Sequence, residues 1–175
     1  MNDEAAKARE ARTLLERLGA RVPGFSGYLE RELRREVDQL LRAELASRLD
    51  TARASLAAYT RTLRPGAAGP LERLGSLDKS LDALANSVRH AGSGYGGLFD
   101  AVKVREEQLE VLYRLDLDLV ESVDDVREAA VSLGSDDKVL ARVEQAAAKV
   151  RAGLDRREGV VRGVFTQDGA GGGGR

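Results

Sequence analysis

Aromatic and positively charged side chains gather in and beside the glycine-rich links of this chain. Arginine, lysine and glycine backbone N–H groups are typical ligands of anions, and aromatic residues with arginine are typical of protein-binding surfaces. Aromatic rings in such links can instead close the end of a helical bundle, where leucine and alanine cannot fill the space. Both interpretations stay open for a candidate partner-binding or anion-binding head. It consists of Phe25, Tyr28, Arg31, Arg34, Arg35, Tyr95, Phe99, Asp100, Lys103 and Arg157.

The residues that usually hold metals are scarce. His90 is the only histidine and cysteine is absent, which excludes zinc sites built on several His or Cys ligands and di-iron sites with two Glu-x-x-His pairs. His90 lies at an expected helix end, where a histidine commonly caps the last carbonyl groups. Carboxylates of the acidic stretch 116–128 are the remaining alternative, for Mg²⁺ or Ca²⁺, but they lack EF-hand spacing. We expect no metal and no cofactor.

The segment 92–97, with the sequence GSGYGG, has the glycine content of a phosphate-binding loop. It lacks the Lys-Ser/Thr ending of a P-loop, and it follows an expected helix, whereas the P-loop and the dinucleotide fingerprint follow a strand. We therefore interpret it as a shaped connection. A catalytic triad cannot be assigned with one histidine and no nucleophile elbow. We expect that the protein is not an enzyme, with an enzyme of unfamiliar type near residues 92–104 as an alternative.

Composition indicates the fold class and excludes several functions. Charged residues make up 33% of the chain and aromatic residues 4%, which is typical of long helices. The net charge of −1 gives no general attraction to nucleic acid, so we expect no nucleic-acid partner. The first residues lack the apolar centre of a secretory signal, and no apolar run reaches the roughly 18 residues of a membrane span. We expect a soluble cytoplasmic protein without a transmembrane segment, and peripheral membrane association stays open.

Apolar residues recur at steps of three and four in five stretches, which predicts five amphipathic helices. The expected ranges are 3–20, 28–63, 70–91, 105–132 and 136–164, with glycine and proline between them. Short links make successive helices antiparallel. The sequence therefore predicts an all-α fold: an elongated antiparallel bundle of four long helices plus a shorter N-terminal helix, with coiled-coil-like packing. Residues 1–166 form one expected domain, and residues 167–175 form a flexible Gly-rich tail.

The expected helix lengths decide where the candidate head lies. At 1.5 Å per residue, a helix over 28–63 is about 55 Å long and a helix over 70–91 is about 33 Å long. The segment 92–104 must cover the difference, so we expect it to return to the end where the long helix starts. The last helix ends there too, and it contributes Arg157, which interrupts its apolar stripe once.

Charge is distributed unevenly between the last two expected helices. Residues 100–137 carry 12 acidic and 4 basic side chains, whereas residues 138–163 carry 7 basic and 3 acidic ones. Such charges are typical of solvated helix faces and of inter-helix ion pairs, each of which contributes roughly a few tenths of a kcal/mol. The alternative interpretation is that the acidic helix binds a basic partner, or that the basic faces bind phosphate.

Two blocks of the chain resemble a family of small, uncharacterised all-helical proteins of bacteria. The blocks are PGFSGY followed by LERELRREVDQLLR, in residues 23–42, and GYGGLFDAVKV with EEQLEVLYRLDLDL, in residues 94–119. The family has no assigned activity, and the resemblance links it to neighbours of stomatin-like membrane scaffolds. It implies an accessory role in a membrane-associated assembly, and it supplies no functional residues.

These observations favour a non-catalytic helical-bundle adaptor or structural protein that engages a protein partner. The alternative is a peripheral binder of anionic lipid or of a phosphate ligand that uses the aromatic and arginine-rich head. Apolar positions exceed what one stripe per helix requires, as at Leu115, Leu117 and Leu119. This excess leads us to expect self-association as a homo-oligomer.

Overall fold

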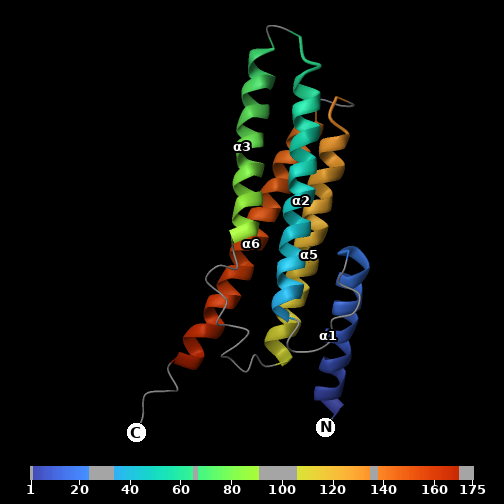
Figure 1. The fold of residues 1–175 in the computed structure, drawn as a ribbon, viewed down its shortest axis with the longest axis vertical. Helices are drawn as coiled ribbons and strands as arrows, with labels where there is room; N and C mark the ends of the chain where they lie inside the picture. The colour runs from blue at the N-terminus through green and yellow to red at the C-terminus, as the bar shows by residue number, and fades with distance from the viewer. Residues whose placement is uncertain (1, 24–33, 65–66, 91–105, 135–137, 170–175) are drawn as a thin grey trace.

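The described part of the chain forms five α-helices, as predicted (Figure 1). The computed structural model describes residues 2–23, 34–64, 67–90, 106–134 and 138–169. The helices are α1 (Asn2–Arg21), α2 (Arg34–Thr60), α3 (Ala68–His90), α5 (Glu106–Val131) and α6 (Val139–Gly169). None of these described helices combines the length and the apolar character that crossing a bilayer requires.

The four long helices form two antiparallel hairpins, α2–α3 and α5–α6, which lie side by side (Figure 1). Within the first hairpin, Arg53 of α2 pairs with Asp78 of α3 at 2.9 Å. Between the hairpins, α2 lies against α5 and α3 lies against α6. Arg73 of α3 donates two hydrogen bonds to Glu144 of α6, and both residues lie near the start of their helices. Neighbouring helices from different hairpins therefore run in the same direction.

The apolar stripes predicted from the sequence form the core that the described helices share. In α3 the stripe is buried as its spacing predicts: Leu74, Leu77, Leu81, Leu84 and Val88. In α2 the buried stripe is Leu41, Leu45, Leu49, Ala52 and Leu56. Because these stripes come together in one shared core, burial of apolar surface stabilises the fold more than local helix propensity does.

The short helix α1 lies outside the four-helix arrangement and packs along α5 (Figure 1). It adds Leu14 and Leu18 to the core, and Val22, just past its end, is buried there too. Leu117 and Leu119 of α5 are buried in that same core. Leu119 lies close to Gly153 of α6, whereas Leu115 is only half-buried. Because Leu117 and Leu119 are buried within the chain, they do not support self-association, which stays a prediction.

Two helix ends differ from the prediction. The helix α2 ends at Thr60 and not at residue 63, because the chain turns there and the Thr62 N–H donates to the Tyr59 carbonyl at 2.9 Å. The helix α6 continues to Gly169, through residues 167–169 of the expected tail. With 31 residues it exceeds the 27 residues of α2 and is the longest described helix. Glycines inside α6 did not end it, since each costs only about 1 kcal/mol in a helix interior.

The expected link after α5 is confirmed at Gly134. Its φ of 89° lies in the left-handed region that favours glycine and commonly ends helices. The ring of Tyr59 from α2 lies 3.1 Å from the position a Cβ would take at Gly134. The end of the α5–α6 hairpin therefore packs directly on the end of α2. The expected N-cap Ser135, the start of the long helix over residues 28–33, and the segment 92–104 lie outside the described residues.

Candidate functional site

Most of the candidate head lies outside the described residues. This applies to seven of its members: Phe25, Tyr28, Arg31, Tyr95, Phe99, Asp100 and Lys103. Arg34 and Arg35 are the first two residues of α2. The starts of α2 and α5 and the end of α3 lie toward the same end of the bundle (Figure 1). The head as a binding site stays a prediction, and Arg157 is the member whose side-chain contacts are described.

Arg157 is the centre of an ion network that consists of Asp38, Arg42, Asp116 and Arg157. Its Nε donates to Oδ1 of Asp116 on α5 at 2.5 Å, and its Nη2 donates to Oδ1 of Asp38 on α2 at 2.6 Å. The other carboxylate oxygen of Asp38 accepts from Nε of Arg42 at 2.8 Å. Arg42 in turn donates from Nη1 to the carbonyl oxygen of Arg89, near the end of α3, at 3.1 Å. The network thus joins all four long helices.

The network lies inside the bundle because Arg157 occupies a core position of α6. It follows Val143 and Val150 at steps of seven, and both valines are fully buried. One turn earlier, α6 approaches α5 so closely that a Cβ at Gly153 would lie 2.8 Å from Leu119 Cδ2. The side chain of Arg157 is only 12% exposed, and that of Asp116 is 9% exposed. The residue that interrupts the apolar stripe is therefore buried with its charge neutralised.

Burial and pairing act in opposite directions on these charges. Burial alone lowers the pKa of Arg157, but the charges of Asp116 and Asp38 and their hydrogen bonds outweigh it, so the net pKa is raised. Burial raises the pKa of Asp116, and the attraction of Arg157 offsets only part of this shift. Arg157 consequently stays positively charged, whereas ionisation of Asp116 is penalised by its surroundings.

The geometry assigns this network a structural role. Two arginines and two aspartates balance in charge, and an anion could bind Arg157 only by displacing buried carboxylates. Each of these hydrogen bonds forms only at one axial position of a helix relative to its neighbour. The network therefore fixes the register of the four helices. Among the described residues, no three His, Cys, Asp or Glu side chains gather as metal ligands.

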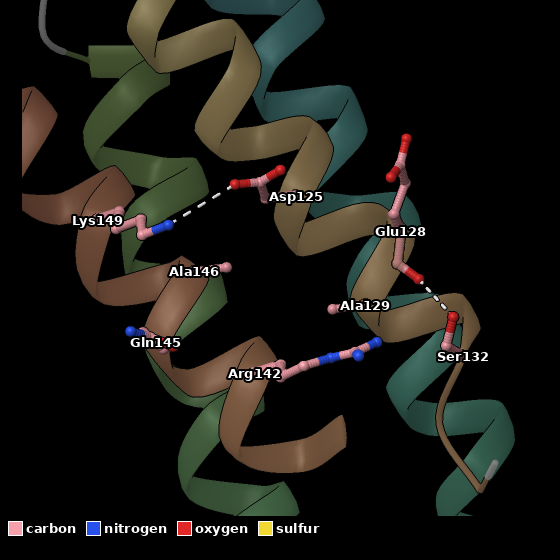
Figure 2. A pocket seen from close by; sticks show the side chains of 8 residues that line it. All are labelled: Asp125, Glu128, Ala129, Ser132, Arg142, Gln145, Ala146 and Lys149. Carbon is pink, nitrogen blue, oxygen red and sulfur yellow. Dashed lines mark hydrogen bonds and ion pairs between the residues drawn. The ribbon is translucent and has the colours of Figure 1, made fainter. Parts of the chain in front are cut away.

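A second, exposed group of charges lines a groove between α5 and α6 (Figure 2). The first of two hollows in this groove, shown in Figure 2, is lined by Asp125, Glu128, Ala129 and Ser132 of α5 and by Arg142, Gln145, Ala146 and Lys149 of α6. An adjoining hollow shares Asp125 and Lys149 and continues past Asp118, Glu121, Ser122, Ala152 and Arg156. We call the two hollows together the charged groove. Its α5 side is acidic and its α6 side is basic, while small alanine and serine side chains lie between them.

The two sides of the charged groove are in register. Asp118, Asp125 and Ser132 follow one another at steps of seven along α5, and Arg142, Lys149 and Arg156 do so along α6. Because the helices are antiparallel, Asp118 lies at the height of Arg156, Asp125 at that of Lys149, and Ser132 at that of Arg142. We call these three levels rungs. Figure 2 shows Arg142 extending from α6 toward α5.

Among the described residues, three of the seven charged side chains of the groove form ion pairs: Glu121, Asp125 and Lys149. The pair of Lys149 with Asp125 spans the groove at 3.9 Å, and both side chains are 59% exposed. In the described part of the molecule, Arg142 and Arg156 form no ion pair. Glu121, which lines the adjoining hollow, is paired with Arg21 of α1 at 3.0 Å. The groove therefore presents acidic and basic side chains to the outside of the bundle, and four of them form no ion pair with the residues that the structure describes: Asp118, Glu128, Arg142 and Arg156.

The sequence indicated an acidic helix followed by a basic one, but not the alignment of their charges. The signal that could have shown it is the shared step of seven in Asp118–Asp125 and in Arg142–Lys149–Arg156. Using it requires the relative height of the helices, which depends on the link after Gly134. Comparison of the chain with models of known protein families, with curated proteins and with solved structures gives no match.

Proposed function

We propose that the protein is a non-catalytic helical-bundle adaptor or structural protein that engages a protein partner through the charged groove. The observation that carries this proposal is the exposed, mostly unpaired state of the groove charges. Two ion pairs elsewhere between helices of the bundle are much closer than the 3.9 Å pair of the groove. Arg73 binds Glu144 at 2.7 Å, and Arg48 binds Asp124 at 2.9 Å.

The shape of the groove suits a helical partner. Between the acidic and the basic side of the groove lie the small side chains of Ala129, Ala146 and Ala152. They leave space in which the backbone of another helix can approach closely. Because one edge of the groove is acidic and the other is basic, a partner must carry basic residues on one side and acidic residues on the other. This requirement selects the orientation in which the partner binds. Such contacts are polar, so we expect modest affinity that weakens as salt screens the charges. The resemblance to helical neighbours of membrane scaffolds supports a partner in a membrane-associated assembly.

The test is affinity capture at low salt with three forms of the full chain: wild type, a groove variant and a control. The groove variant is Asp118→Lys with Asp125→Lys, which makes both edges of the groove positive. The control, Glu72→Lys with Asp155→Lys, makes the same change in net charge at exposed positions that do not line the groove. We expect wild type and control to retain the same protein and the groove variant to lose it. Equal retention by all three forms would contradict the proposal.

A further inference from the structure

The charged groove is complementary to itself, and we propose that the partner it binds is a second copy of this chain. The two copies are related by a two-fold axis parallel to the helices. This inference rests on the proposed function, because it names the partner of the same surface. It does not use Leu117 and Leu119 of α5, which are buried within one chain.

The direction of the two-fold axis follows from the charges. An axis parallel to the helices places α5 of one copy against α6 of the other, and each residue keeps its height. The acidic row, Asp118 and Asp125 of α5, then faces the partner's basic row, which consists of the charged residues Arg142, Lys149 and Arg156 of α6. By symmetry, the basic row of the first copy faces the acidic row of the partner. A two-fold axis that lies in the interface and crosses the helices at right angles would place α5 against α5. That arrangement opposes like charges, which is unfavourable.

Equal heights give specific contacts at each rung. Asp118 faces the partner's Arg156, and Asp125 faces the partner's Lys149. By symmetry the same contacts form a second time, so each of these rungs becomes a square of alternating charges. At the third rung Arg142 faces the partner's Ser132, which carries no charge. The partner's Glu128 lies one helical turn from that serine, within reach of Arg142.

The exposure of these residues agrees with such an interface. Asp118, Glu128, Arg142 and Arg156 are exposed, and the one ion pair across the groove among the described residues is long. The alanines of the groove allow the two faces to approach until their charges meet. Because surface ion pairs are individually weak and screened by salt, the dimer is expected to be concentration-dependent and to dissociate at high salt.

The first test is sedimentation velocity of the full chain over a range of concentrations at low and high salt. We expect wild type to dimerise at low salt and to become monomeric at high salt. The acidic-row variant, Asp118→Lys with Asp125→Lys, and the basic-row variant, Lys149→Glu with Arg156→Glu, should each weaken self-association at least about tenfold, since attraction becomes repulsion. An equimolar mixture of the two variants should form a mixed dimer. That rescue also shows that both variants are folded.

The second test uses a carbodiimide, which joins a carboxylate to a lysine amine in direct contact. Chains with normal and with heavy nitrogen are mixed, so that a cross-link between two copies carries both isotopes. We expect a mixed-isotope cross-link between Asp125 and Lys149. Lys149→Arg is the matched control: it keeps the charge and the dimer but removes the amine, and the cross-link should disappear.

The outcomes separate this inference from the proposed function. A wild-type chain that is monomeric at every concentration overturns the dimer, and it leaves the proposed function standing if the groove variant still loses a captured protein. A dimer that neither row variant weakens overturns the groove as its interface. If the row variants change neither the mass nor the capture of a partner, both the inference and the proposed function fail.

Discussion

The ion network and the charged groove use the same residue types in opposite ways. In the network, Arg157 lies at a core position and binds Asp116 and Asp38 at 2.5 and 2.6 Å. In the groove, Lys149 faces Asp125 at 3.9 Å with both side chains largely exposed. Buried charges interact strongly but are costly to desolvate, whereas exposed charges cost little and stay available. The difference separates charges that hold the helices in register from charges that can bind a partner.

Removal of Arg157 is the strongest test of this distinction. Arg157→Ala leaves Asp116 buried without a cation and leaves Asp38 with Arg42 alone. We expect a loss of about 3–5 kcal/mol in the free energy of unfolding, as for other broken buried pairs. Urea denaturation followed by circular dichroism measures it. A loss below about 1 kcal/mol would show that the network is not what holds these helices together.

Because Arg157→Ala can prevent folding altogether, a second variant accompanies it. Arg157→Met with Asp116→Leu removes both charges and fills the space with apolar side chains. We expect stability close to that of wild type, since replacement of a buried ion pair by packed apolar residues is often neutral or stabilising. Recovery in this double variant shows that the unpaired carboxylate, and not lost volume, destabilises Arg157→Ala.

The helices themselves were predictable because their signal is local. Steps of three and four in α3 placed Leu74, Leu81 and Val88 in the core, and all three are buried. Helix ends were less predictable, because glycine ends α5 at Gly134 but lies inside α6 at Gly153 and Gly159, so the residue type alone does not decide where a helix stops. Which helices become neighbours, as α2 with α5 and α3 with α6, also follows from long-range packing, which no local pattern encodes.

The ion network was only partly predictable. The sequence showed Arg157 as a single interruption of an apolar stripe and assigned it to a head on the basis of helix lengths. It did not show that Asp38 and Asp116, 119 and 41 residues away in the chain, would neutralise it. A charge at a core position indicates a buried partner in general, but its identity depends on which helices become neighbours.

A smaller effect is expected from neutralising Asp116 while keeping its shape. In Asp116→Asn, Arg157 still has Asp38 as its counter-ion, so we expect a loss of about 1 kcal/mol or less at neutral pH. The pH dependence tests the cause more sharply. Because the pKa of Asp116 is raised in the folded protein, the native state binds its proton at a higher pH than the unfolded state does.

This linkage has a definite sign. Between the unfolded pKa of about 3.9 and the raised native value, the contribution of Asp116 to stability falls as the pH rises. The stability of wild type relative to Asp116→Asn should therefore increase as the pH is lowered from neutral toward about 4. Urea unfolding of both proteins at several pH values measures this difference. The opposite trend would mean that pairing with Arg157 outweighs the burial of Asp116.

The smallest effect on stability is expected in the charged groove. Asp125→Asn with Lys149→Gln removes the pair across the groove, and we expect a change within about 0.5 kcal/mol because both side chains are exposed. The measurement belongs at high salt and low protein concentration, where self-association does not add to stability. A loss as large as that of Arg157→Ala would place the groove pair among the structural contacts and end the distinction between the two regions. If the fold is unchanged but dimer formation at low salt is weakened, the groove charges act between chains and are not needed to hold the helices of one chain together.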